Sequence, residues 1–377
     1  MNTEYQEKLQ LFQDNVSLKH TRKVPYLSNA FTWKIYDSGY GMQEAMRNNE
    51  KMMKLQCEFH ERYQFDAYMD LGARNPLRVL DALGNSYYEI TDMGINVVDH
   101  VLMEPEEYTE YAENPALFSW IKLMKRKFPD VRGKQLQMAM LEFLGHAKYT
   151  SVVGQKFVEE YHCPSVYSGA NVIIPPYEYF FQTARGIRNM GRDVRKYKTQ
   201  LLEAIDAQMK QSVLPGLQYA LTQDSSAYVC DTYMAIIGYG ILSPSQFGEI
   251  YWPTIQKVLE LLEKADKTLY IFCEGEMLRY AEYFQDIPKG RAVLHVENDD
   301  IFEVRRKLPN ICLAGGMKTE LLGNGTAEEC VDYAKRLIDG LGDGYIFSEN
   351  KMLSFHNDAK RVNLLAVREF VREYDRS

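Results

Sequence analysis

Four short apolar runs in the last third of the chain constrain its fold more than any other feature. They begin at Leu269, Arg291, Ile311 and Gly344, and each stops at charged residues or glycine. The segments between them have the apolar spacing of helices. Short buried strands that alternate with amphipathic helices are typical of βαβ units and a parallel sheet. Because reacting groups in such folds gather just past the carboxyl ends of the strands, we expect the active site there.

The residues at these four strand ends are the first candidates for that site. They are Glu274, Gly275 and Glu276; Glu297, Asn298 and Asp299; Gly315 and Gly316; and Ser348, Glu349, Asn350 and Lys351. We expect the middle two groups to contact substrate. Glu274 follows an apolar strand, so burial would raise its pKa and suit it to proton transfer. Lys351 could pair with Glu274, and we predict that both are catalytic.

Composition narrows the class of protein. Lysine and arginine number 44 and aspartate and glutamate number 52, which gives a net charge of −8 and disfavours nonspecific binding to nucleic acid or acidic membranes. The six cysteines include no CxxC pair, and no apolar stretch approaches the roughly 20 residues of a membrane helix. The N-terminus does not resemble a signal peptide. We therefore expect a cytoplasmic protein with reduced thiols.

The rest of the chain continues the same alternation of strands and helices. We predict a first strand near residues 24–31, a second at 65–69, a third at 165–172 and a fourth at 227–233. About eight strands with intervening helices indicate a (β/α)8 TIM barrel, an α/β fold, formed as one domain by residues 1–377. Turn signals between Asn75 and Asp99 predict a small antiparallel unit, so residues 72–164 would form an insertion or lid after the second strand. A doubly wound open sheet is the alternative, although no GxGxxG motif follows the first strand.

Several blocks of sequence resemble the uroporphyrinogen decarboxylase superfamily. They are LSPSQFGEIYWPTIQKVLELL, FCEGE, AGGMKTELLGNGTAEECVDYAKRLI and GYIFS. The resemblance implies a barrel that supports one of two reactions. The first is cofactor-free decarboxylation of uroporphyrinogen. The second is zinc-dependent methyl transfer between a corrinoid protein and a thiol such as coenzyme M, with tetrahydrofolate as the acceptor in some relatives.

The residues that match the decarboxylases are few. Those enzymes carry an arginine-rich segment after the first strand, where this chain reads NAFTWKIYDSGYG with only Lys34 basic. A substrate with many carboxylates needs several cations, so the substitution argues against uroporphyrinogen. Asp70 does match the acidic residue that follows the family's second strand. It is either catalytic or a cap for the next turn.

The zinc ligands of the thiol methyltransferases are replaced as well. Their HxCG motif aligns with Phe272, Cys273, Glu274 and Gly275, and their later cysteine aligns with Lys351. We therefore expect no zinc thiolate site. Glu274 and His295, with carboxylates in neighbouring loops, could hold a harder metal or act as acid and base. The alternatives are solvated loop carboxylates and a hydrogen-bonded core histidine.

The resemblance implies a methyltransferase component of a corrinoid-dependent system that acts on a small molecule or a folate. The chain would bind no cofactor covalently, would meet a corrinoid on a partner protein, and would form a homodimer. Tyr167 and Asn171 are further candidates for lining the substrate pocket. Two alternatives stay open: a carboxy-lyase that uses Asp70 and Glu274, and a binding barrel without catalysis.

Overall fold

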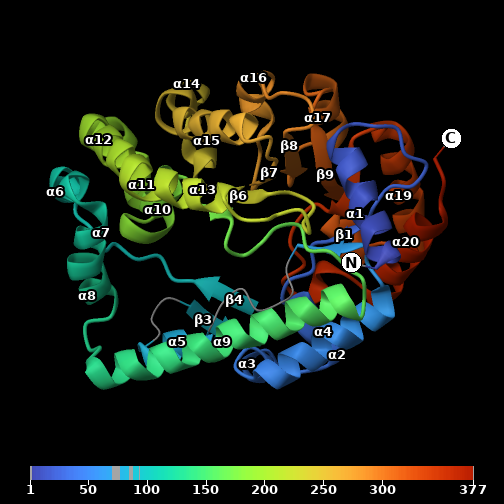
Figure 1. Cartoon of the computed structure of the whole chain (residues 1–377), viewed down its shortest axis with the longest axis horizontal. Helices are drawn as coiled ribbons and strands as arrows, with labels where there is room; N and C mark the ends of the chain where they lie inside the picture. The colour runs from blue at the N-terminus through green and yellow to red at the C-terminus, as the bar shows by residue number, and fades with distance from the viewer. Residues whose placement is uncertain (1, 70–76, 85–87, 93, 377) are drawn as a thin grey trace.

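The chain forms a mixed α/β structure built around a six-stranded parallel sheet (Figure 1). It is a computed structural model that describes residues 2–69, 77–84, 88–92 and 94–376. The strand order in the sheet is β10-β9-β8-β7-β6-β5, and β1 and β2 form a separate parallel pair. The strands are β1 (Leu27–Ser28), β2 (Ala67–Tyr68), β3 (Tyr88–Thr91), β4 (Gly94–Val97), β5 (Val172–Ile173), β6 (Thr232–Ile236), β7 (Leu269–Cys273), β8 (Ala292–Val296), β9 (Cys312–Met317) and β10 (Tyr345–Glu349).

Helices surround the sheet, and those of the N-terminal 160 residues lie at its side and below it in Figure 1. They are α1 (Thr3–Val16), α2 (Trp33–Ser38), α3 (Met42–Ala45), α4 (Asn49–Tyr63), α5 (Leu77–Ala82), α6 (Tyr108–Glu113), α7 (Pro115–Phe118), α8 (Met124–Lys127), α9 (Gly133–Glu159), α10 (Pro176–Tyr179), α11 (Ile187–Lys196), α12 (Lys198–Gln208), α13 (Leu214–Leu221), α14 (Pro244–Gln246), α15 (Trp252–Lys264), α16 (Ala281–Phe284), α17 (Ile301–Lys307), α18 (Thr319–Asn324), α19 (Ala327–Leu341) and α20 (Arg361–Glu373). Among the described residues, no helix is long and apolar enough to cross a membrane.

Side chains of the sheet alternate between two apolar cores, as the two-residue period of a strand requires. On one face, Tyr270, Phe272 and Val293 join Tyr5 and Phe12 of α1 in a compact cluster. The intervening side chains of the same strands face the outer helices and belong to a second, larger cluster. Both faces of β7 and β8 are therefore buried, which explains why these strands read as unbroken apolar runs.

The predicted strands after Leu269 are confirmed, but two earlier ones begin elsewhere. The expected third strand, 165–172, is reduced to a bridge between Ser165 and Tyr68 and to the short β5. The expected fourth strand, 227–233, begins only at Thr232. Just before this strand, the Asp231 carboxylate accepts hydrogen bonds from the backbone N–H and the hydroxyl of Thr268 and forms an ion pair with Lys267. The residues from 228 to 231 form bends and no strand.

Between β2 and the bridge at Ser165, the chain forms a separate group of elements. β3 and β4 pair in antiparallel fashion, as the turn signals predicted. The 27-residue helix α9 then runs along the outside of the molecule, at the bottom of Figure 1. The division of the chain into a barrel domain and an insertion stays a prediction.

Candidate active site

The candidate site lies along the edge of the sheet where β7, β8, β9 and β10 end. The four strands are parallel neighbours, so their carboxyl ends meet on one side. The residues expected from the sequence at these ends are consequently brought together by the fold. Asp70, the remaining predicted catalytic residue, lies outside the described residues.

Glu297 and Asp299 hold the loop that follows β7. The Glu297 Oε2 atom accepts a hydrogen bond of 2.6 Å from the backbone N–H of Gly275. The Asp299 Oδ2 atom accepts hydrogen bonds from the backbone N–H groups of Met277 at 2.5 Å and Leu278 at 3.1 Å. Burial raises the pKa of both carboxyls above their usual range. The two side chains therefore order the loop, and burial lets Glu297 keep its proton to a higher pH than an exposed glutamate would.

His295 is a fully buried residue that joins three strands. Its Nε2 atom lies 3.0 Å from the carbonyl oxygen of Glu349 and 3.1 Å from that of Asn350, so Nε2 carries the proton. Its Nδ1 atom lies 2.7 Å from the Tyr270 hydroxyl and accepts a hydrogen bond from it. Burial lowers the pKa of His295 to about 4, which keeps the ring neutral. Both nitrogens are thus engaged, and the ring has no free lone pair for a metal ion.

The glycine pair at the end of β9 allows close packing of the backbone. Gly315 and Gly316 have φ angles of 101° and 91°, in a backbone region that residues other than glycine rarely adopt. A Cβ atom on Gly315 would lie 2.8 Å from the carbonyl oxygen of Val296 and 3.2 Å from His295 Nε2. Gly315 is therefore needed for contact between β8 and β9, whereas Gly316 also lines the cavity described below.

The two remaining predicted catalytic residues lie at opposite ends of this group of strands. Glu274 is half-buried just after β7, and its backbone N–H donates to the carbonyl of Ile236 at 3.0 Å. Lys351 follows β10, and its Nζ atom lies 3.1 Å from Glu320 Oε1. The charge of Lys351 also lowers the pKa of Glu297, against the larger effect of burial. The structure thus pairs Lys351 with Glu320.

Tyr167 and Asn171 make contacts at β6. The ring of Tyr167 stacks on that of Tyr233 with centroids 4.1 Å apart. The Asn171 Nδ2 atom donates to the carbonyl of Asp231 at 3.0 Å, and its own carbonyl accepts from the N–H of Tyr233. Both residues therefore attach the segment before β5 to β6, and Tyr167 also lines a different cavity near α9.

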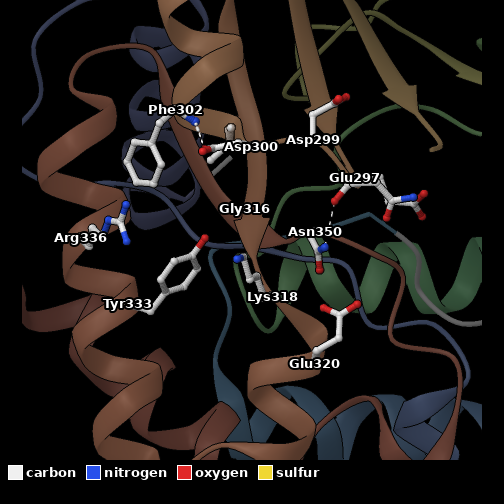
Figure 2. Close-up of a pocket in the computed structure, with 12 residues that line it drawn as sticks. Glu297, Asp299, Asp300, Phe302, Gly316, Lys318, Glu320, Tyr333, Arg336 and Asn350 are labelled. Atoms are coloured by element: carbon white, nitrogen blue, oxygen red, sulfur yellow. Dashed lines mark hydrogen bonds between the residues drawn. The ribbon is translucent and has the colours of Figure 1, made fainter. Parts of the chain in front are cut away.

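A cavity of about 530 Å³ opens between the loops that follow β8 and β9 (Figure 2). Asn350 connects these loops, because its Nδ2 donates to the carbonyl of Glu297 at 2.9 Å and its Oδ1 accepts from the N–H of Thr319 at 3.0 Å. The cavity is lined by Glu297, Asn298, Asp299, Asp300, Ile301, Phe302, Gly316, Lys318, Glu320, Tyr333, Arg336 and Asn350. Four of the seven residues predicted to contact substrate, namely Glu297, Asn298, Asp299 and Gly316, therefore line one cavity.

A buried carboxylate that sequence reasoning did not explain lies at the end of β10. Glu349 is fully buried and accepts hydrogen bonds of 2.7 Å from the Tyr26 hydroxyl and from the backbone N–H of Asn29. Burial raises its pKa. Two further buried polar atoms, Asn29 Nδ2 and Ser348 Oγ, have no hydrogen-bond partner among the described residues. The abrupt change from an apolar run to Ser-Glu-Asn was the only signal for this group.

Comparison with known proteins places the chain in a family. Residues 187–374 match the sequence model of the uroporphyrinogen decarboxylase (URO-D) family. The chain belongs to the uroporphyrinogen decarboxylase superfamily. A solved methyltransferase from Methanosarcina mazei has a similar fold, with a TM-score of 0.64 and 15% sequence identity over 97% of this chain and 98% of that one. No curated protein matches the sequence. The resemblance noted from the strand-end motifs is confirmed.

The zinc site of some superfamily members does not fit the residues present in this one. Phe272, at the position of a histidine ligand, packs against His295 with ring centroids 4.5 Å apart. The Cys273 thiol is completely buried, and burial raises its pKa, which disfavours the thiolate that zinc requires. Within the described ranges, no three His, Cys, Asp or Glu side chains lie close enough to hold a metal ion.

Proposed function

We propose that this protein is a methyltransferase component of a corrinoid-dependent system, acting on a small molecule or a folate. The observation that carries the proposal is the chemistry of the strand ends. Glu274 aligns with a zinc ligand of the family, and Glu297, whose pKa is raised by burial, follows the next strand. Acids at this position suit a substrate that must gain or lose a proton, and not a metal-bound thiolate. The fold shared with the methyltransferase from Methanosarcina mazei supports the same assignment.

The segment after β1 disfavours the decarboxylase reaction on uroporphyrinogen. Its one basic residue, Lys34, is only 2% exposed within α2. The segment itself therefore offers a ligand with many carboxylates no accessible cation of its own. The shortage of cations bears on the substrate alone, so methyl transfer is still the favoured reaction.

In this proposal each residue at the edge has a distinct task. Glu274 transfers the proton, assisted by Asp70, and Glu297 orders the loop that follows β7. Lys351 neutralises Glu320 and tunes Glu297. The cavity walls formed by Asn298, Asp299 and Gly316 receive the substrate. A corrinoid on a partner protein would carry the methyl group.

We further propose that the strands close into a (β/α)8 barrel that comprises the whole chain, with residues 72–164 as its lid. Parallel bridges outside the main sheet support closure: Tyr26 pairs with Phe347 of β10, and Tyr68 of β2 pairs with Ser165. The N–H groups of Val229 and Cys230 then donate to the carbonyls of Ser165 and Val166. These bonds would complete a ring of eight parallel segments.

A carboxy-lyase is the second candidate, and the raised pKa of Glu297 favours it. A carboxyl that keeps its proton nearer neutrality could protonate the carbanion left after loss of CO2. The substrate would be a smaller acid than uroporphyrinogen.

The proposal is tested with methylcobalamin as the probe. The purified chain is mixed with methylcobalamin and candidate acceptors, and demethylation is followed by the cobalamin absorbance. Glu274→Gln should lower the rate about 10²–10⁴-fold, the usual contribution of acid–base catalysis. The matched control is Glu276→Gln, because Glu276 is an exposed carboxyl two residues away. Equal rates for the two variants would remove Glu274 from the mechanism. Release of CO2 from a carboxylated substrate, without methyl transfer, would favour the lyase.

A further inference from the structure

The long helix α9 has apolar side chains on two sides, and only one side is covered. Its inner side chains, including Tyr149, Val153 and Phe157, are buried against the neighbouring helices. On the other side, Met140 is 61% exposed and Phe143 is 52% exposed. Leu136, Leu141 and Leu144 are about as exposed. Monomeric proteins rarely leave so many large apolar side chains together in water.

The exposed side of α9 contains a regular seam of six residues. Leu136, Met140, Phe143, Ala147, Thr150 and Gly154 follow one another at alternating intervals of four and three. This spacing averages 3.5 residues and is typical of the contact line between two paired helices. None of the six is buried. The seam is therefore open along about two and a half heptads.

Side-chain size is graded along this seam. The N-terminal half presents Leu136, Met140 and Phe143, whereas the C-terminal half presents only alanine, threonine and glycine. A parallel helix of the same sequence would put large side chains against large ones. An antiparallel copy would place each large residue opposite a small one, with Phe143 against Ala147 and Leu136 against Gly154 of the other chain. The seam is thus complementary to itself about a two-fold axis.

The small half of the seam also borders a cavity that could receive those large side chains. The cavity has a volume of about 610 Å³, and its wall includes Thr150, Gly154, Phe157, Val158 and Tyr228. A Cβ atom built on Gly154 would meet nothing within 4 Å. Leu136 and Met140 of a second copy would therefore find both a small-residue surface and an open apolar space.

We propose that α9 is the centre of a two-fold homodimer in which two α9 helices pack antiparallel. A stable interface buries about 800 Å² from each partner. Leu136, Met138, Met140, Leu141, Phe143 and Leu144 of α9 are each 46–61% exposed and would supply apolar area to such an interface. The nearly uncharged seam also has the apolar character of permanent homodimer contacts. The proposal does not depend on the reaction that the protein catalyses.

The oligomeric state tests the proposal directly. Light scattering on the eluting full chain should give about twice the chain mass of 43.8 kDa. Phe143→Asp should halve that mass while the circular dichroism spectrum stays unchanged. The control is Val362→Asp, since Val362 is 61% exposed on α20 away from the seam, and it should leave the dimer intact. A monomeric parent chain, or a dimer that survives Phe143→Asp, would overturn the proposal.

Cysteine cross-linking tests the antiparallel register. The double variant Leu136→Cys with Gly154→Cys should oxidise to a covalent dimer, whereas Leu136→Cys alone should not. Background reaction is small because Cys57 is only partly exposed and the five other native cysteines are buried. Cross-linking of the single variant as fast as the double would refute the antiparallel arrangement. Binding of the parent chain as a monomer to anionic vesicles would assign the apolar side of α9 to a membrane surface instead.

Discussion

The neutral buried state of His295 predicts a measurable dependence of stability on pH. In the unfolded chain a histidine has a pKa near 6.5, whereas burial lowers the pKa of His295 to about 4 in the folded protein. Between about pH 6.5 and 4 the unfolded state therefore binds a proton that the folded state does not bind. The stabilisation associated with the neutral ring is complete above pH 6.5 and is lost as the pH falls through about 4.

The size of the effect follows from the shift in pKa. Each unit is worth about 1.4 kcal/mol, so a shift of about two and a half units corresponds to about 3 kcal/mol of unfolding free energy. His295→Gln removes the titrating ring but keeps an N–H that can donate to the carbonyl of Glu349 or Asn350. At neutral pH the variant should lose about 1–3 kcal/mol, because the Tyr270 hydroxyl loses its acceptor.

Urea unfolding followed by circular dichroism at several pH values between about 7.5 and 4.5 measures this difference. The parent chain should lose stability more steeply than His295→Gln, and the two curves should converge toward acid. His60, whose pKa burial also lowers to about 4, contributes equally to both proteins and cancels. Parallel curves across the whole range would refute the neutral, buried assignment of His295.

Two further substitutions test the backbone packing at Gly315 and the buried ion pair between Arg185 and Asp193. Gly315→Ala should destabilise the fold by about 1–3 kcal/mol, because it combines a φ of 101° with a Cβ atom 2.8 Å from the Val296 oxygen. Thermal denaturation measures the loss. The control is Gly240→Ala, since a Cβ atom there would meet nothing within 4 Å. Asp193→Asn should cost about 3–5 kcal/mol in chemical denaturation, because it leaves the buried Arg185 without its carboxylate at 2.6 Å. Arg192→Gln, at the exposed side of the same carboxylate, should change stability little, and equal losses for the two variants would contradict the buried ion pair.

Local patterns in the sequence were enough to predict the elements that depend on near neighbours. The apolar runs after Leu269 were expected to be parallel strands, and they are β7 to β10. The antiparallel pair of β3 and β4 followed from its turn signals. In both cases the decisive interactions are burial of alternate side chains and turn geometry within a few residues, which a single segment displays.

The sequence could also identify which residues gather at the strand ends, since parallel strands share an edge. It could not predict their partners. Glu297 accepts from Gly275, 22 residues earlier, and Glu349 accepts from Tyr26, 323 residues earlier. The start of β6 was misplaced as well, and the Asp231 carboxylate before it bonds Thr268, 37 residues later in the chain.

The sequence by itself determined the α/β alternation, the superfamily and the presence of Phe272, Glu274 and Lys351 at positions that align with zinc ligands of the family. Each of these depends on residue type and short-range order. Only the tertiary structure decided that His295 is a neutral link between strands, that Lys351 pairs with Glu320, and that one side of α9 stays uncovered. These properties depend on burial and on contacts between distant segments. Burial sets the pKa values and the exposed area, and it exists only once the chain has folded.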